Sequence, residues 1–305
     1  MNPLTGIALK VMSVTIFVAM ATCIKAAAET VPPGETVFFR AFFAIPVILV
    51  WLWFSHDLRD GLKTQNPLGH FWRGLVGSTA MMLSFAALAL LPLPEVTAIG
   101  YAAPVLTVIF AAMFLGERIR AFRMSAVILG LVGVVIILAP RLTTLREGTG
   151  DALEALGAVM MLTSAVFMAL AQVLVRKLVD TEKTPAIVFY FSVSAAVLSL
   201  VTLPFGWVVP GWTEFGLMVL SGLLGGVGQI FLTSSYRYAE TAVIAPFEYT
   251  SILLAVVVGY WLFDEVPTQT VLAGVALVIC AGLIIIYRER QLGLERAAQR
   301  RVNTP

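Results

Sequence analysis

Charged residues are scarce in this chain, and their scarcity excludes a soluble globular protein. Asp, Glu, Lys and Arg make up only 12% of the 305 residues, whereas 59% are hydrophobic. Soluble domains average about 25% charged and about 45–50% apolar residues. The composition therefore indicates an integral membrane protein.

Histidine and cysteine are also scarce, which limits the chemistry available to the chain. There are only two of each. His56 and His70 fall in one polar segment, and Cys23 and Cys280 fall in apolar stretches, so no disulfide framework is predicted. A hydrolase in the membrane needs a nucleophile–base pair or a set of metal ligands. We therefore expect no enzyme, no metal and no cofactor, and an intramembrane enzyme stays only as a remote alternative.

The few charges gather into clusters separated by long apolar intervals. A bilayer core needs about 20 apolar residues per helix, and none of the intervals alternates polar and apolar residues as a barrel wall would. The pattern predicts ten transmembrane helices, at about 5–25, 36–55, 73–92, 96–116, 122–140, 155–175, 185–207, 214–236, 242–263 and 267–287.

The distribution of positive charge predicts that both termini are cytoplasmic. With ten helices and the N-terminus inside, most Lys and Arg fall in inner segments, and only Lys25, Arg141 and Arg146 lie outside. The first interval imitates a signal peptide, with Lys10 before an apolar run. Its removal would leave nine spans, and the charge distribution favours ten. The basic tail after Tyr287 is interpreted as a topology anchor, not a nucleic-acid site.

One apolar stretch occurs twice, and its spacing predicts an inverted repeat. "YAAPVLTVIFAAMFLGE" begins at Tyr101 in the fourth interval, and "YTSILLAVVVGYWLFDE" begins at Tyr249 in the ninth. An odd number of crossings separates the copies, so the second is upside down. "SAVILGLVG" after the first copy is echoed by "GVALVICAG" after the second. Inverted repeats of this kind support alternating access around one midplane site.

At these residues the chain resembles the bacterial EamA branch of the drug/metabolite transporter superfamily. The most specific pieces are "FFRAFFAIPVIL" at 38–49 and "FLGERI" at 114–119, while "FDEVP" in the second copy departs from the family pattern. The resemblance implies an all-α integral membrane fold of ten helices in two inverted five-helix repeats, 1–145 and 146–305, around a central cavity. It implies that the fifth and tenth helices are peripheral. Within the family, the chain is similar to aromatic-amino-acid exporters.

Polar, aromatic and sulfur-bearing side chains recur at helical spacing in several intervals. Gly225, Gln229 and Thr233 share one stripe, as do Met160, Ser164, Met168 and Gln172. The predicted substrate-binding residues are Ser78, Met82, Phe85, Tyr101, Ser164, Met168, Gln229, Thr233 and Tyr249. Small-residue faces and methionines also serve in helix packing, so that alternative stays open. Pro46, Pro104, Pro204 and Pro246 are expected kinks or hinges, or simple packing residues.

Two charges within the intervals are electrostatic or gating candidates. Arg40 lies near the outer end of the second interval and Glu248 near the inner end of the ninth. Neither residue reaches the membrane midplane on these boundaries. The alternatives to an electrostatic or gating role are snorkelling or packing for Arg40 and an ion pair with Arg237 for Glu248. No acid lies near the centre, so proton coupling is not supported. For Glu117 and Glu265, capping of the next helix is favoured over solvation at the interface and over substrate or proton handling.

These features predict a transporter that exports small neutral metabolites across the bacterial inner membrane by alternating access. Amino acids, including aromatic ones, are the predicted substrates. A nucleotide-sugar or organophosphate exchanger of the same superfamily is the alternative. It is disfavoured because a single arginine provides little positive charge for an anionic substrate. A channel is disfavoured by the repeat. The expected partners are a small molecule and the lipid bilayer, with no nucleic acid, and a monomer or a homodimer is equally open.

Overall fold

The described part of the chain is entirely helical in its regular structure. A computed structural model describes residues 3–56, 60–115, 121–147, 152–179, 181–238, 245–280, 283, 284 and 287, and no strand occurs among them. The all-α prediction is confirmed. Six helices are long and apolar enough to cross a membrane, and the shorter apolar helices Ile128–Pro140, Phe247–Phe263 and Gln269–Cys280 accompany them. The count of ten crossings stays a prediction.

The helices follow the predicted intervals in order. The first five intervals contain α1 (Pro3–Ala27), α2 (Pro33–Phe42), α3 (Ala44–Phe54), α4 (Pro67–Leu90), α5 (Leu93–Gly100), α6 (Ala102–Leu115) and α7 (Ala121–Glu147). The next contain α8 (Ala152–Val179), α9 (Thr184–Ser199), the 3₁₀ helix η1 (Leu200–Phe205), α10 (Trp212–Tyr238), the 3₁₀ helix η2 (Ala245–Tyr249) and α12 (Thr250–Phe263), followed by the helix Gln269–Cys280.

One predicted boundary is wrong by almost two turns. The sequence places the start of the third interval at residue 73, but α4 begins at Pro67. Asn66 caps this helix: its side chain accepts a hydrogen bond from the Gly69 N–H at 2.9 Å, and a proline at the first helical position needs no N–H partner. His70 and Arg73 therefore lie inside α4 and not in a loop.

Prolines divide several of the apolar segments. A proline in a helix removes one backbone hydrogen bond and its ring clashes with the carbonyl four residues earlier. Accordingly, α2 ends at Phe42, four residues before Pro46, and α5 ends at Gly100, four residues before Pro104. The α-helix before Pro204 changes to 3₁₀ geometry at Leu200. The helices are thus interrupted four residues before each of these three prolines, and Pro246 lies within η2.

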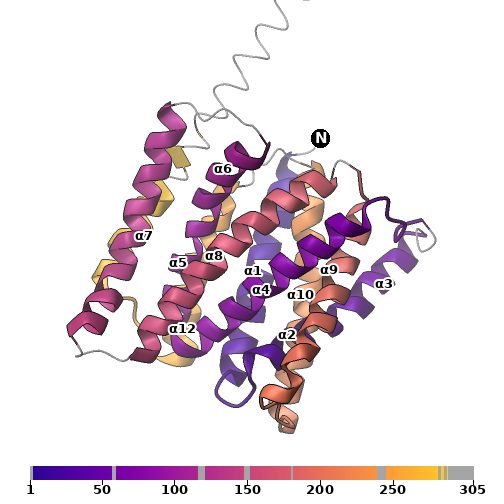
Figure 1. Cartoon of the computed structure of the whole chain (residues 1–305), viewed down its shortest axis with the longest axis horizontal. Helices are drawn as coiled ribbons and strands as arrows, with labels where there is room; N and C mark the ends of the chain where they lie inside the picture. Colours follow the sequence, from indigo (N-terminus) through magenta and orange to yellow (C-terminus); the bar gives the residue numbers. More distant parts are fainter. Residues whose placement is uncertain are drawn as a thin grey trace, which may run out of the picture.

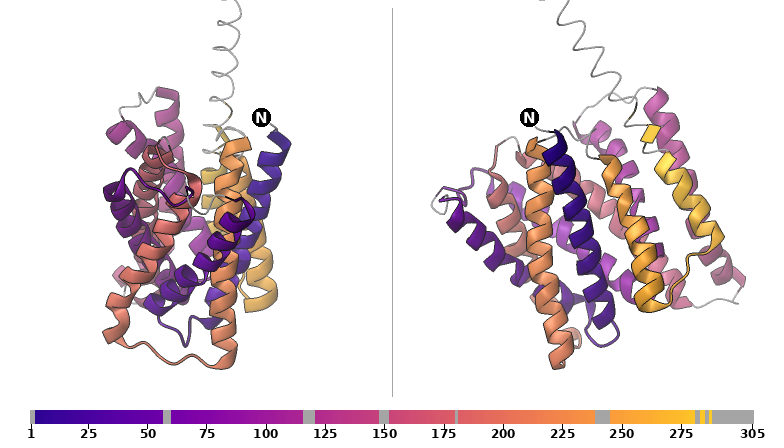
Figure 2. Two further views of the ribbon diagram at one scale, coloured as in Figure 1. Left: turned by 90° about the vertical axis from the view of Figure 1, so that its right-hand side faces the viewer. Right: turned by 180° about the vertical axis from the view of Figure 1, so that it is seen from behind.

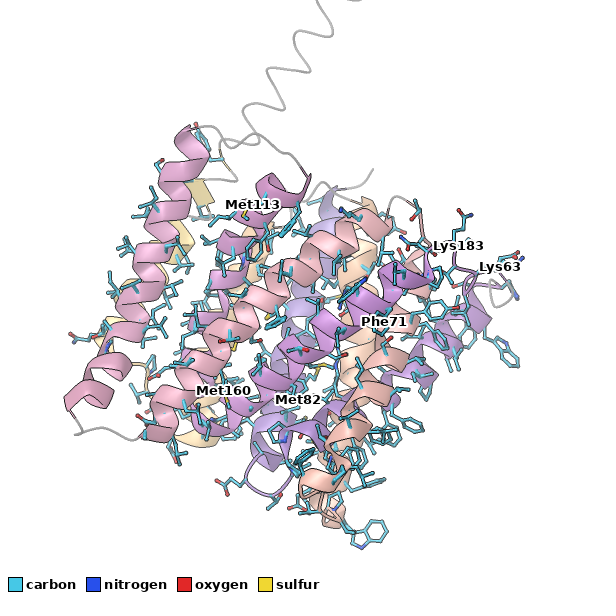
Figure 3. The ribbon with its side chains drawn as sticks, in the orientation of Figure 1. Lys63, Phe71, Met82, Met113, Met160 and Lys183 are labelled. Atoms are coloured by element: carbon cyan, nitrogen blue, oxygen red, sulfur yellow. The ribbon has the colours of Figure 1, made fainter. Side chains whose placement is uncertain are left out.

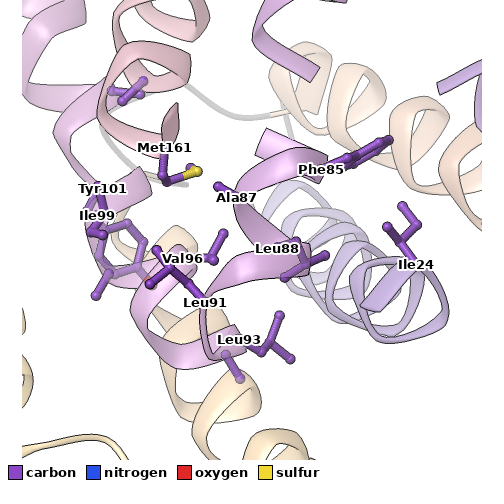
Figure 4. Packing of buried hydrophobic residues seen from close by; sticks show 14 of the residues in the cluster. Ile24, Phe85, Ala87, Leu88, Leu91, Leu93, Val96, Ile99, Tyr101 and Met161 are labelled. Atoms are coloured by element: carbon purple, nitrogen blue, oxygen red, sulfur yellow. The ribbon is translucent and has the colours of Figure 1, made fainter. Parts of the chain in front are cut away.

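The helices pack in pairs that bring distant parts of the chain together. α1 runs beside α10, and α4 lies along α8 (Figure 1). The views from the side and from behind show α1 and α10 adjacent over much of their length (Figure 2). The main buried cluster includes the turn from α4 to α5, where Leu88, Leu91, Leu93 and Val96 pack with Met161 of α8 (Figure 4).

α7 and the helix Gln269–Cys280 lie together at one edge of the bundle (Figures 1 and 2). Gly133 and Gly274 let their backbones approach. A Cβ on Gly274 would lie 2.7 Å from the carbonyl oxygen of Gly133 and would collide with the side chain of Ile137. This is the close small-residue packing that helix pairs use in membranes.

We expect Gly274→Ala to lower the thermal stability of the protein in detergent, by about 1–3 kcal/mol, because the new methyl group overpacks this contact. Gly216→Ala is the matched control, since a Cβ there meets no atom within 4 Å among the described residues. The control should be neutral or stabilising, because alanine is the better helix former. Equal losses in the two variants would contradict the packing assignment.

Candidate functional site

Two arginines converge on one aromatic ring in the interior of the bundle. The guanidinium carbon of Arg40, from α2, lies 5.7 Å from the ring centroid of Phe191 in α9. That of Arg73, from α4, lies 4.0 Å from the same centroid. The three helices pack against one another. The two guanidinium groups are therefore no further apart than the sum of these distances.

The cluster lies well inside the apolar segments. Arg40 and Arg73 are each about 10 Å along their helices from Pro33 and Pro67, at 1.5 Å per residue. α2 starts at the end of the bundle where α1 ends, and α4 starts at the opposite end, so the side chains approach from opposite sides. Arg40 is only 5% exposed. A side chain enclosed to this degree does not snorkel to the surface. Arg73 is half-buried, with its Nε and Nη1 atoms buried.

Glycines on α4 and α10 make room for the arginine side chains. A Cβ on Gly77 of α4 would collide with Nη1 of Arg73 and lie 2.8 Å from the ring of Phe191. A Cβ on Gly225 of α10 would lie 3.0 Å from Nε of Arg40 and 3.1 Å from the sulfur of Met20 in α1. Gly225, from the predicted stripe on α10, thus faces the cluster, and five helices contribute to it.

Several buried polar atoms in this region have no hydrogen-bond partner among the described residues. They are Nε of Arg40 and Nε and Nη1 of Arg73. Oγ of Ser78, elsewhere on α4, is also buried without a described partner. Ser78 is 5% exposed. Sequence reasoning proposed Arg40 and Ser78 but missed Arg73 and Phe191. The Asn66–Pro67 capping pattern was the signal that would have placed Arg73 inside a helix.

The repeated tyrosines meet each other. The rings of Tyr101 and Tyr249 lie 5.2 Å apart at an interplanar angle of 73°. The Tyr101 hydroxyl is 2.6 Å from Oγ of Ser251, and Tyr101 is buried. The two residues that open the repeated stretches are therefore in direct contact.

The other predicted binding residues have varied surroundings. Ser164 donates a hydrogen bond to the carbonyl of Ala80 at 2.6 Å, joining α8 to α4, and Thr233 donates to the Gln229 carbonyl at 2.7 Å within α10. Met82 and Phe85 belong to the packed core, with Met82 on α4 and Met160 on α8 where these helices lie side by side (Figure 3). Met168 is 37% exposed and Gln229 is half-buried. These residues remain binding-site predictions.

Two lysine–glutamate pairs join α1 to the α12 region, one at each end. Lys10 pairs with Glu248 in η2, and Lys25 lies 2.8 Å from Glu265, which follows α12. Lys25 also donates to the carbonyl of Leu91 at 2.7 Å. The partner found for Glu248 is thus Lys10, in place of the predicted Arg237, whose side chain lies outside the described residues.

Glu265 caps a helix, but not the one that the sequence predicted. Its Oε2 accepts a hydrogen bond from the N–H of Leu93, the first residue of α5, at 2.8 Å. The capping interpretation is right in kind and wrong in the helix, because tertiary packing brings the end of α12 to the start of α5. Glu117, the equivalent acid in the first copy, lies outside the described residues.

A buried carboxylate joins the loops before α4 and α9. Glu182 accepts hydrogen bonds from the N–H groups of Gln65 and Asn66 and the hydroxyl of Thr64, at 2.7–3.0 Å. His70 Nε2 lies 3.5 Å from its other oxygen. Burial would raise the pKa of Glu182, but these donors outweigh it, and the pKa lies below its ordinary value of 4.5. Lys63 and Lys183 project from the same two loops (Figure 3).

Comparisons with known proteins identify a transporter family. Residues 4–139 and 155–288 match the EamA-like transporter family, and residues 93–205 also match Solute carrier family 35. A crystal structure with 19% sequence identity superimposes with a TM-score of 0.66, over 94% of this chain and 98% of the other, and so shares the fold.

Two curated relatives match most of the chain. An S-adenosylmethionine uptake transporter of Rickettsia felis is 29% identical over 257 residues, covering 84% of both chains. The pseudopaline exporter CntI of Pseudomonas aeruginosa is 31% identical over 281 residues, covering 91% of this chain and 94% of the relative. Neither is an aromatic-amino-acid exporter, so these relatives support the family and small-molecule transport but not that narrower similarity.

The contacts of Glu265 predict an order of stabilities. Glu265→Ala removes the cap of α5 and leaves Lys25 without its counter-charge, so we expect a loss of about 3 kcal/mol or more. Glu265→Gln keeps an acceptor oxygen and should lose less. Thermal unfolding in detergent measures both. Asp60→Ala is the control, because its ion pair with Lys63 is exposed and should contribute little to stability. A Gln variant as unstable as the Ala variant would contradict the capping role.

The lowered pKa of Glu182 predicts a pH dependence of stability. A carboxylate whose pKa is depressed by folding stabilises the protein above its unfolded pKa, and this contribution is lost as the pH falls through the folded value. The difference in melting temperature between the wild type and Glu182→Gln should therefore be largest near about pH 7 and shrink below about pH 4.5. Glu29→Gln, at an exposed loop position, should show little difference at either pH. A difference that grows on acidification would contradict the assignment.

Proposed function

Because this chain belongs to the EamA-like transporter family, we propose that this multi-pass membrane transporter exports small zwitterionic metabolites, amino acids among them, by alternating access. Family membership rests on matches over most of the chain. The relatives carry S-adenosylmethionine and pseudopaline by name, which supports small organic cargo. One relative is named for uptake and the other for export, so the direction needs its own test.

The contact between Tyr101 and Tyr249 carries the proposal of alternating access. These residues open the two copies of the repeated stretch, and a contact between equivalent residues is expected at an axis that relates two halves. The helix pairs follow the same relation. α1 packs on α10 and α4 packs on α8, so the first span contacts the eighth and the third contacts the sixth. Equivalent spans in the two halves are five apart, so each of these pairs is the repeat equivalent of the other. Both observations support ten helices in two inverted halves, 1–145 and 146–305.

The helix ties suggest which parts move together. α1 and the α12 region are joined by an ion pair at each end, so we infer that they move as one unit and not as two alternating gates. The helices are already interrupted after α2, α5 and α9, next to prolines. A bend of the span at these positions therefore breaks no further helical hydrogen bond. We place both termini in the cytoplasm and the protein in the bacterial inner membrane on the charge distribution.

A nucleotide-sugar or organophosphate exchanger is the second candidate function. The sequence disfavoured it because only one arginine was recognised within the spans. Arg73 adds a second positive charge to the same cluster, which favours an anionic group on the cargo more than the sequence alone allowed.

Transport into proteoliposomes tests the two candidates. We expect purified protein to accumulate or exchange labelled neutral amino acids, such as methionine or phenylalanine, above protein-free vesicles. Labelled nucleotide sugars and sugar phosphates form the second arm, and each arm is run with and without a pH gradient. The direction of transport is obtained by loading the vesicles with labelled substrate and measuring its efflux separately through protein inserted inside-out and right-side-out. Transport of phosphorylated cargo alone would replace the proposed function by the second candidate.

A further inference from the structure

We propose that Arg40 and Arg73, over the ring of Phe191, bind the carboxylate of the transported molecule. This inference rests on the proposed function, because it assigns the anionic group to the cargo. It starts from a physical imbalance: two guanidinium groups share one ring in the apolar interior, and neither forms an ion pair with any acidic side chain in the described part of the chain.

The contact with Phe191 does not by itself offset the cost of burial. A cation over an aromatic ring gains about 0.5–2 kcal/mol. A buried charge that lacks a hydrogen-bonded partner costs several kcal/mol, and the second positive charge adds repulsion. Three guanidinium nitrogens here are buried without an acceptor among the residues that the structure describes. An anion that accepts hydrogen bonds from both arginines removes the repulsion and satisfies these donors together.

The architecture keeps the arginines at the ring. Gly77 and Gly225 lack the Cβ atoms that would push the two side chains away. Arg40 reaches the ring from one end of the bundle and Arg73 from the other, so the pair sits where a midplane site is expected for inverted repeats.

The apolar neighbours of the cluster, and not its charge, favour a carboxylate on an apolar body over a phosphate. The two lysines of α1 are already paired, Lys10 with Glu248 and Lys25 with Glu265. The two guanidinium groups therefore supply the positive charge that would bind an anion at the cluster. A guanidinium fork matches a flat carboxylate in two parallel hydrogen bonds. The amphipathic surroundings, with Phe191 and Met20 beside the arginines, suit an organic acid group on an apolar body.

Ligand-dependent thermal stability in detergent tests this site without requiring transport. The probes are sodium phenylacetate and L-methionine, with phenylacetamide as the neutral analogue, inorganic phosphate as the second anion, and sodium chloride to match ionic strength. We expect the carboxylates to raise the melting temperature by about 2 °C or more at saturation, and phenylacetamide and chloride to leave it unchanged.

The variants assign the effect to the cluster. Arg40→Gln and Arg73→Gln should abolish the shift, Arg73→Lys should weaken it because the fork is lost, and Gly77→Ala should weaken it by displacing the guanidinium group of Arg73. Lys63→Gln, which removes an exposed positive charge from a loop, should keep the full shift. Without ligand, either arginine variant should melt no lower than the wild type, because it removes one of two repelling charges.

Each outcome bears on the assignment. No carboxylate shift in the wild type, a shift that survives in both arginine-to-glutamine variants, or a shift with phosphate alone would overturn it. A strong loss of ligand-free stability in both variants would show that the arginines are structural. A carboxylate shift that depends on both arginines, in protein that transports no amino acid, would overturn the proposed function and leave the anion site standing.

Discussion

The burial of two guanidinium groups is the constraint on which the centre of this bundle depends. Charges in the interior of a membrane protein are costly and need partners or compensating contacts. Here α2, α4 and α9 meet at Phe191, and both arginine side chains lie over its ring. The glycines of α4 and α10 leave the space that these long side chains fill. Helix packing and electrostatics are therefore set by the same few residues.

The two lysine–glutamate ion pairs of α1 differ from the arginine cluster in having their partners within the described part of the chain. Lys10 and Lys25 each find a glutamate, and the lysine–glutamate pair at the end of α1 is supplemented by the backbone of the α4–α5 turn. These groups have their partners within the chain, so they hold elements together. The arginines have none among the described residues, which is why the binding inference falls on them and not on the better-formed ion pairs.

Several features were predictable because they depend on local sequence alone. The apolar intervals located the helices, since only helices or closed barrels satisfy backbone groups in lipid and no interval alternates. The prolines were recognised as candidate kinks, and the helix breaks after Phe42 and Gly100 lie four residues before two of them, at the carbonyl with which a proline ring clashes. The apolar stretch that begins at Tyr101 and recurs from Tyr249 was also recognisable in the sequence, and the structure shows that the two tyrosine rings are in contact.

Tertiary structure decided the partners. The sequence marked Glu265 as a cap, but only packing showed that the helix it caps is α5, distant in the chain. It marked Arg40 as a charge within a span but did not mark its neighbour Arg73, because the six helical residues before Arg73 were assigned to a loop. No periodicity within α4 could show that a ring of α9 lies beside Arg73. Local sequence determines where a helix starts, bends and stops; which side chains meet in its interior depends on how separate helices cross, and that is a property of the whole bundle.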